Sequence, residues 1–131
     1  MTNEAVNIEL PTIIVSRNIA DGTAIAKGTL LKLSGQNIGI SANLDSMAFG
    51  GITVEEKTAS DGITNIAVAM DGVYDLVVAT GSTAITCGAG ATMSGTNLVR
   101  LAVEADYPLG AVIGNFEEPG AAGDTLRVRL K

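Results

Sequence analysis

The sequence predicts an all-β protein built around a small barrel, and three observations support this fold class. Apolar and polar residues alternate with a period of two in the longest patterned segments, as they do on half-buried strands. Turn-forming pairs that contain glycine or proline separate these segments at short intervals, which is typical of barrels and sandwiches. Segments with helical periodicity are scarce, so we expect at most one or two short helices.

The three clearest strands lie in the second half of the chain. In residues 66–78, bulky apolar side chains alternate with alanines until Asp71-Gly72, a pair that favours a turn. Two interpretations are open for this segment: a hairpin that turns at Asp71-Gly72, or one long strand broken by a bulge. Residues 98–104 repeat the alternation, and residues 125–131 show it most cleanly.

Shorter segments complete the predicted sheet. Six of them have the composition of strands: residues 13–15, 29–33, 38–41, 51–54, 84–87 and 109–114. Residues 43–51 and 54–62 could each form a turn or two of helix, and residues 106–108 could begin or end a short one.

The pattern predicts one β-rich domain over residues 13–131, preceded by an extended N-terminal arm over residues 1–12. The arm is polar at first and ends near Pro11, and its sequence contains no clear pairing signal. We find no internal repeat and no domain boundary in the sequence.

Composition limits the functions that the chain can have. Of its 131 residues, 47% are hydrophobic, 17% are charged and 3% are aromatic, so the core must consist of small and β-branched side chains. The net charge of −6 and the scarcity of aromatic rings argue against a nucleic-acid partner. No apolar run approaches the roughly 18–20 residues of a membrane span, and the N-terminus does not resemble a signal peptide. A single cysteine fits a cytosolic origin.

The absence of histidine is the most restrictive feature. It removes the Ser-His-Asp and Cys-His nucleophile systems and the usual zinc sites. We therefore expect no catalytic residues, no cofactor and no metal ion.

The glycine-rich segment "CGAGATMSG" has a superficial likeness to a phosphate-binding loop. It lacks the Gly-Lys-Ser/Thr ending, a following helix and an acidic residue for a ribose. Every second residue from Ile85 to Met93 is apolar, which favours a strand kept thin so that neighbouring strands or subunits can approach closely. Cys87 has no basic neighbour in the sequence, so we expect a buried packing residue and not a nucleophile.

Charged residues offer few candidates for chemistry. The acidic pairs are Glu55-Glu56, Asp71 with Asp75, Glu104 with Asp106, and Glu117-Glu118. Adjacent residues of a strand point to opposite faces and most of these acids lie near turns, so a catalytic pair is not expected. The basic row Arg127, Arg129 and Lys131 has three interpretations: a stripe for an acidic partner, an ion-pair row at a subunit interface, or a solvated strand face that discourages edge aggregation.

Three segments together resemble the head-decoration, or capsid cement, proteins of tailed bacteriophages and related viruses. They are "GTLLKLS", "GGITVEEKTASDGITNIAVAMDGVYDLVV" and "LVRLAVEADYPLGAVIGNFEEPGAAGDTLRVRLK". The resemblance covers most of the chain from about residue 22 and lies in the order and style of the segments, not in a catalytic signature.

The resemblance implies a β-tulip-like barrel that forms a homotrimer at three-fold or quasi-three-fold positions of the outer capsid surface. Such proteins are structural virion components that stabilise the head, are made in the host cytoplasm and bind the major capsid protein and copies of themselves. In several of them an N-terminal arm adds a strand to the capsid protein. By position, the capsid-contact arm here would comprise Thr2, Asn3, Glu4, Ala5, Val6, Asn7, Ile8, Glu9 and Leu10. Arg127, Arg129 and Lys131 would be available for a subunit interface.

Two other function classes stay open. "DGVYDL" is similar to the central motif of trimeric nucleotide hydrolases of the deoxyuridine triphosphatase type, although the other motifs of those enzymes are absent. The second alternative is a surface-binding β module, which the lack of tryptophan disfavours.

Overall fold

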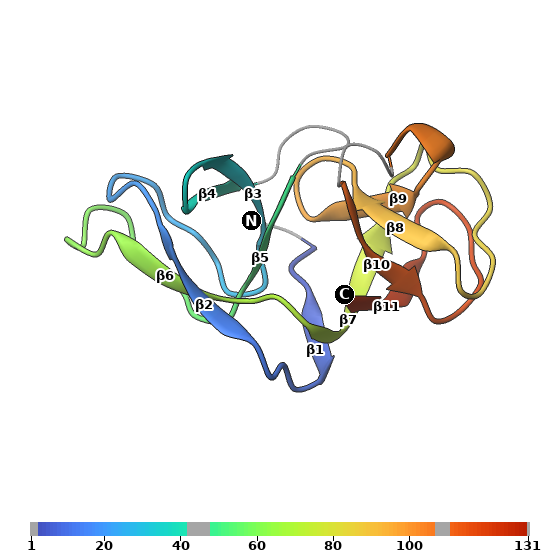
Figure 1. The fold of residues 1–131 in the computed structure, drawn as a ribbon, viewed down its shortest axis with the longest axis horizontal. Helices are drawn as coiled ribbons and strands as arrows, with labels where there is room; N and C mark the ends of the chain where they lie inside the picture. Colours follow the sequence, from blue (N-terminus) through green and yellow to red (C-terminus); the bar gives the residue numbers. More distant parts are fainter. Residues whose placement is uncertain (1–2, 42–47, 107–110, 131) are drawn as a thin grey trace.

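The protein consists of two small β-barrels that lie side by side, as the computed structural model shows in Figure 1. The structure describes residues 3–41, 48–106 and 111–130. The first barrel contains β2 (Ile14–Asn18), β3 (Leu30–Gly35), β4 (Ile38–Ser41), β5 (Phe49–Thr53) and β6 (Asn65–Ala69). The second contains β7 (Gly72–Val78), β8 (Gly90–Met93), β9 (Leu98–Leu101), β10 (Val112–Phe116) and β11 (Thr125–Leu130).

The prediction of an all-β fold is confirmed. The described residues contain one helical element, the 3₁₀ turn η1 (Glu104–Asp106), and the predicted helix over residues 54–62 is replaced by a loop. Residues 42–47 and 107–110 lie outside the described part. The helix prediction over residues 43–51 is wrong in its described part, because Phe49–Gly51 belong to strand β5. The prediction that a short helix begins or ends at residues 106–108 agrees with η1, whose last residue is Asp106.

Both barrels have the same topology. In the first, the strands close in the order β2-β4-β3-β5-β6. In the second, the order is β7-β9-β8-β10-β11, and the ring closes because β7 pairs with both β11 and β9. Each barrel has one parallel pairing, β2 with β4 and β7 with β9, and the other pairings within each ring are antiparallel. Two barrels with the same strand order are an internal structural repeat.

The conclusion that the sequence has no internal repeat is therefore wrong. Residues 23–38 and 83–98 align at a constant offset of 60 with seven identities. The identical pairs are Thr23/Thr83, Ala24/Ala84, Ile25/Ile85, Gly28/Gly88, Ser34/Ser94, Gly35/Gly95 and Asn37/Asn97. Gly28 and Gly88 have φ values of 86° and 89°, and Asn37 and Asn97 have 57° and 55°, so the conserved spacing reproduces the same turns. Outside this window identities are sparse, such as Val68/Val128 at the same offset and Glu55-Glu56/Glu117-Glu118 at an offset of 62.

Asp71-Gly72 does not form a hairpin. β6 and β7 belong to different barrels and do not pair, so this pair is the crossing point between them (Figure 1). The alternative of one long strand broken by a bulge is wrong as well, because β6 and β7 are separate strands of different sheets. The predicted strand over residues 84–87 is also wrong: Ile85 makes an isolated bridge to Gly120, and β8 begins only at Gly90.

One hydrophobic core joins the two barrels. Leu30, Ile52 and Ala69 of the first barrel are buried in the same cluster as Leu76 and Phe116 of the second. A smaller cluster around Leu31, Ile66 and Val68 fills the first barrel alone. Full burial of a large aliphatic side chain stabilises a fold by about 1.5–3 kcal/mol, so the shared cluster contributes substantially to holding the barrels together.

The division of the chain into an arm over residues 1–12 and one β-rich domain over residues 13–131 stays a prediction.

Candidate functional site

The predicted N-terminal arm is docked on the second barrel. Its central part is β1 (Val6–Glu9), which pairs antiparallel with β7 and places Asn7 opposite Tyr74. Figure 1 shows β1 between the two barrels, where the chain crosses from β6 to β7. Thr2 lies outside the described residues, so the structure locates the proposed contact arm from Asn3 to Leu10.

Two glycines allow the arm to approach the barrels closely. The amide of Ala5 donates to the carbonyl of Gly28 at 2.8 Å, and a Cβ atom on Gly28 would lie 2.6 Å from the carbonyl oxygen of Ala5. At Gly72, whose φ is 104°, a Cβ atom would lie 2.9 Å from the carbonyl oxygen of Glu9. A side chain at either position would collide with the backbone of the arm.

Asp71 holds the turn by which the arm enters β2. Its Oδ1 accepts hydrogen bonds from the amides of Thr12 at 2.9 Å and Ile13 at 2.8 Å, and its Oδ2 accepts one from the Thr12 hydroxyl. The hydroxyl of Thr12 and the amide of Ile13 favour the charged carboxylate and lower the pKa of Asp71. Asp71 therefore has a structural role in the turn, and we assign it no catalytic one.

Apolar side chains of the arm are exposed to solvent. The exposed fraction is 59% for Val6, 40% for Ile8 and 84% for Leu10. Ile13, just before β2, and Ile14, its first residue, are also about half exposed. We call these five residues the aliphatic arm surface. Several exposed aliphatic side chains in one segment are typical of a contact site for another macromolecule.

The basic row of β11 lies inside the sheet. β11 is paired with β7 on one side and β10 on the other, so the row does not protect an open edge. Arg129 bonds Glu9 of the arm at 2.9 Å and Glu117 at 2.8 Å, and these carboxylates raise the pKa of its guanidinium. Arg127 lies 3.5 Å from Asp75. Lys131 lies outside the described residues, and a role of the row at a subunit interface stays a prediction.

Several other carboxylates of the predicted pairs have structural partners. Asp106 is buried and bonds Arg100 in a two-pronged arrangement at 2.9 and 3.0 Å. Glu55 accepts a hydrogen bond from the amide of Ala67, and Glu118 accepts one from the amide of Arg127.

Within the described ranges no group of three or more His, Cys, Asp or Glu side chains is arranged to hold a metal ion. No helix of that part of the chain is long and apolar enough to cross a membrane.

Cys87 is exposed, and the expectation of a buried packing residue is wrong. The left-handed φ of Gly88 breaks the continuous strand that was predicted over residues 85–93, so Cys87 lies in the turn before β8 and not in a packed strand. Its thiol lies 3.4 Å from the carbonyl oxygen of Glu117.

Two structurally important polar residues were missed. Lys57 is buried and donates to Asp21, Asp61 and the carbonyl of Thr58. Burial lowers the pKa of this ammonium, but the hydrogen bonds and charges of Asp61 and Asp21 outweigh it, so the net pKa is raised. A lysine in a polar loop carries no sequence signal for burial. Asn97, in contrast, could have been found from its repeat partner Asn37.

No family model matches the sequence, and no curated protein matches it. Among solved structures, one similar chain is the N base of head fiber gp8.5 of bacteriophage phi29. It has a TM-score of 0.55 and 12% sequence identity over 91% of this chain and 93% of that one. This chain is similar in fold to a phage head-fiber base. At 12% identity the likeness establishes a shared fold alone.

Proposed function

We propose that this protein is a structural component of a bacteriophage virion that binds the outer surface of the head and stabilises it, without catalytic activity. The observation that most supports the proposal is the likeness in fold to a head-fiber base along nearly the whole chain. The lack of histidine and the structural partners of Asp106, Glu55 and Glu118 agree with a protein that acts by contact.

We propose that the arm, Thr2 to Leu10, contacts the major capsid protein. The aliphatic arm surface would exclude water against an apolar patch of the shell, and burial of each Å² of apolar surface contributes roughly 25 cal/mol. β1 is already fixed on β7, so the arm would lose little conformational freedom on binding. Preorganisation of this kind increases affinity without adding contacts.

Homotrimerisation at three-fold or quasi-three-fold positions is the second part of the proposal. A closed trimer would present three arms at once, and several weak contacts then sum to durable attachment. The side chains of Arg127 and Arg129 are 46% and 44% exposed, so they can face a neighbouring copy while they keep their partners within the chain.

Co-sedimentation with expanded phage heads stripped of surface proteins tests the contact. We expect the full-length protein to pellet with the heads and the double variant Val6→Ser/Ile8→Ser to lose at least tenfold in affinity. Val103→Ser is the matched control, because Val103 is 51% exposed and lies far from the arm in sequence, near η1. Absence of binding by the full-length protein would refute the proposed function. Equal binding by the double variant would refute the arm contact alone.

Two further measurements complete the test. Sedimentation velocity of the protein after its mild release from the heads should give the mass of a trimer. If only the monomer mass is found, the proposed homotrimer is contradicted. Incubation with deoxyuridine triphosphate and other nucleoside triphosphates should give no turnover, whereas hydrolysis would favour the enzyme alternative.

A further inference from the structure

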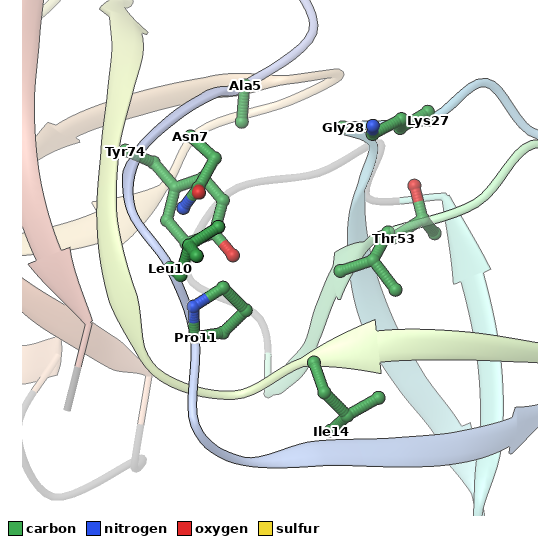
Figure 2. A pocket seen from close by; sticks show the side chains of 10 residues that line it. Ala5, Asn7, Leu10, Pro11, Ile14, Lys27, Gly28, Thr53 and Tyr74 are labelled. Carbon is green, nitrogen blue, oxygen red and sulfur yellow. The ribbon is translucent and has the colours of Figure 1, made fainter.

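A cleft lies where the arm faces the two barrels. Its walls come from the arm, from the loop before β3, from β5 with the residue after it, and from the start of β7, and its volume is about 280 Å³. Figure 2 shows the arm on one side and Lys27, Gly28 and Thr53 on the other. The contacts of Gly28 with Ala5 and of Gly72 with Glu9 fix the width of this space, so the cleft is formed before any ligand arrives.

Most of the lining is apolar, and the polar groups are largely engaged. The Thr53 hydroxyl donates to the carbonyl of Ala26 at 2.8 Å and accepts from the amide of Thr29 at 2.9 Å. The side-chain amide of Asn7 donates to the carbonyls of Glu9 and Val73. The Thr53 hydroxyl and the Asn7 side-chain amide could donate to a ligand only if one of these hydrogen bonds were broken.

The Tyr74 hydroxyl is different. Tyr74 is 3% exposed, and its hydroxyl has no hydrogen-bond partner among the described residues. Figure 2 shows the hydroxyl oxygen turned from the β7 wall into the cleft. A buried hydroxyl without a partner costs about 1–3 kcal/mol, which a ligand that accepts its hydrogen bond would recover.

Two charges act on a ligand in the cleft: the positive charge of Lys27, which lines it, and the negative charge of Asp71, which lies outside the lining but acts on the Tyr74 hydroxyl. Of the described residues that line the cleft, Lys27 is the only charged one, and it stands on the wall opposite Tyr74 (Figure 2). Burial, together with the negative charge of Asp71, raises the pKa of Tyr74, so its hydroxyl stays a donor at neutral pH. Asn7 lies close enough to oppose this shift in pKa, but its amide is held by the two carbonyls named above.

We propose that this cleft binds a short aliphatic carboxylate, with a carboxylate oxygen on the Tyr74 hydroxyl and the hydrocarbon chain against Leu10, Pro11 and Ile14. The volume of about 280 Å³ equals roughly nine water molecules at about 30 Å³ each, which suits a group of six to eight non-hydrogen atoms. Such a group could be a free short-chain acid or the carboxyl-terminal leucine of a polypeptide. This site goes beyond the proposed head contact: Leu10 and Ile14 belong to both surfaces, whereas Tyr74 and Lys27 line the cleft and are not part of the aliphatic arm surface.

Titrations followed by NMR test the site. The probes are hexanoate as the free acid, and Gly-Gly-Leu with a free carboxyl terminus as the peptide source. Hexylamine and 1-hexanol are the controls of equal length. We expect saturable shifts at Tyr74, Leu10 and Ile14 with hexanoate or with the peptide, at least tenfold weaker binding of hexanol, and none of hexylamine.

Variants separate recognition from folding. Tyr74→Phe should bind the carboxylate about tenfold more weakly, because a hydrogen bond to a charged group contributes about 1.5–3 kcal/mol, while its melting temperature stays equal or rises. Lys27→Gln should weaken binding, whereas Lys32→Gln, outside the cleft, should not. Equal binding of hexanoate, hexanol and hexylamine, or unchanged affinity in Tyr74→Phe, would overturn the proposal. So would the absence of saturable shifts with both carboxylate probes.

Discussion

Asn97 shows how one side chain can couple two barrels. It is buried, its φ is 55°, and its Oδ1 accepts a hydrogen bond from the amide of Leu30 in the first barrel at 3.0 Å. Its repeat partner Asn37 has nearly the same φ of 57° but is exposed, and its Oδ1 accepts from Arg17. The two positions therefore share the backbone requirement and differ in burial, which makes them a matched pair.

Replacement of the two asparagines should separate these contributions. Asn97→Ala should lower the free energy of unfolding by about 2–4 kcal/mol, from left-handed strain and from a buried Leu30 amide without its partner. Asn37→Ala should cost about 1–2 kcal/mol, mainly from the same backbone strain. Urea unfolding of the two variants measures the difference. Equal losses of unfolding free energy in the two variants would show that the hydrogen bond from Leu30 to Asn97 contributes nothing to stability.

Asp71 should make stability depend on pH in the acid range. The pKa of its carboxyl is lowered from 3.8 in the folded state, chiefly by the Thr12 hydroxyl. The unfolded chain therefore takes up the proton first, and the stabilisation is complete above about pH 5 and is lost as the pH falls through and below 3.8.

Thermal unfolding between about pH 5 and about pH 2 checks this effect. Asp71→Asn should show a smaller fall in melting temperature than the native protein over that range. Part of the fall should persist, because the pKa of Asp61 is also lowered, first by its bond to Lys57. Thr12→Val removes one donor and should give an intermediate slope. An unchanged slope in Asp71→Asn would contradict the assignment.

At the scale of an element, the arm depends on Gly28 in a way that the repeat makes testable. Gly28 and Gly88 occupy equivalent turns with φ values of 86° and 89°. A Cβ atom on Gly28 would meet the arm at 2.6 Å, whereas one on Gly88 would find no atom within 4 Å. Both substitutions by alanine strain the backbone, but only one of them should displace the arm.

Limited proteolysis and hydrogen exchange should reveal the displacement. In Gly28→Ala we expect cleavage within residues 3–12 to accelerate and the amide of Asp75, which faces β1, to exchange faster. Gly88→Ala should lose a similar amount of stability, roughly 1 kcal/mol, with the arm still protected. An equally protected arm in both variants would mean that the Gly28 contact does not hold it.

The edges of β2 and β7 should also differ in the native protein. The amide of Met70 donates to the carbonyl of Ile13, and the amide of Ile19 donates to the carbonyl of Thr64. The backbone groups of odd-numbered residues in and next to β2 therefore face β6, and the amides of Ile14 and Ser16 face away from it. No bond from the described residues reaches these two amides. The corresponding amides of β7, at Val73 and Asp75, face β1.

Hydrogen exchange of the native protein at neutral pH measures this difference directly. Ile14 and Ser16 should exchange much faster than Val73 and Asp75, because an open strand edge leaves its amides in contact with water. Similar protection at all four amides in dilute protein would contradict the open edge of β2. Protection that appears only at high protein concentration would indicate that another chain covers it.

For the whole molecule, the sequence predicted the fold class but not the number of barrels. Alternation of apolar residues identified β6, β7, β9 and β11, and burial follows this alternation most strictly in β11. The same alternation occurs whether a strand closes one barrel or another, so it carries no information about which strands share a ring. Closure depends on pairings between distant strands, such as β7 with β9, which local patterns do not encode.

The candidate site was predictable to a similar degree. The position of the arm and its alternating residues could be read from the N-terminal sequence, whereas its partner β7 could not. The cleft could not be foreseen either, because Tyr74, Leu10 and Thr53 are far apart in the chain and meet only when both barrels and the arm are in place. The repeat was missed because seven identities fall in one window of 16 residues, and the matches beyond it are isolated or need a different offset.

The shared core leads to a prediction about cooperativity. Ile52 lies on β5 of the first barrel, is 0% exposed, and packs in the cluster that contains Leu76 and Phe116 of the second barrel. Val68 on β6 is equally buried but belongs to the cluster of the first barrel alone. If the common cluster makes the barrels one folding unit, damage to either barrel should lower the stability of both.

Ile52→Ala and Val68→Ala test this coupling. Ile52→Ala should lower the free energy of unfolding by about 2–5 kcal/mol, the usual cost of such a cavity. Hydrogen exchange under mild denaturant should report the same loss for slowly exchanging amides in β6 and in β10, since both open only in the global transition. Val68→Ala should give a smaller loss that is again equal in the two strands. A loss confined to β6 in either variant would mean that the barrels unfold separately, and that the cluster between them is a contact surface between two independently stable halves.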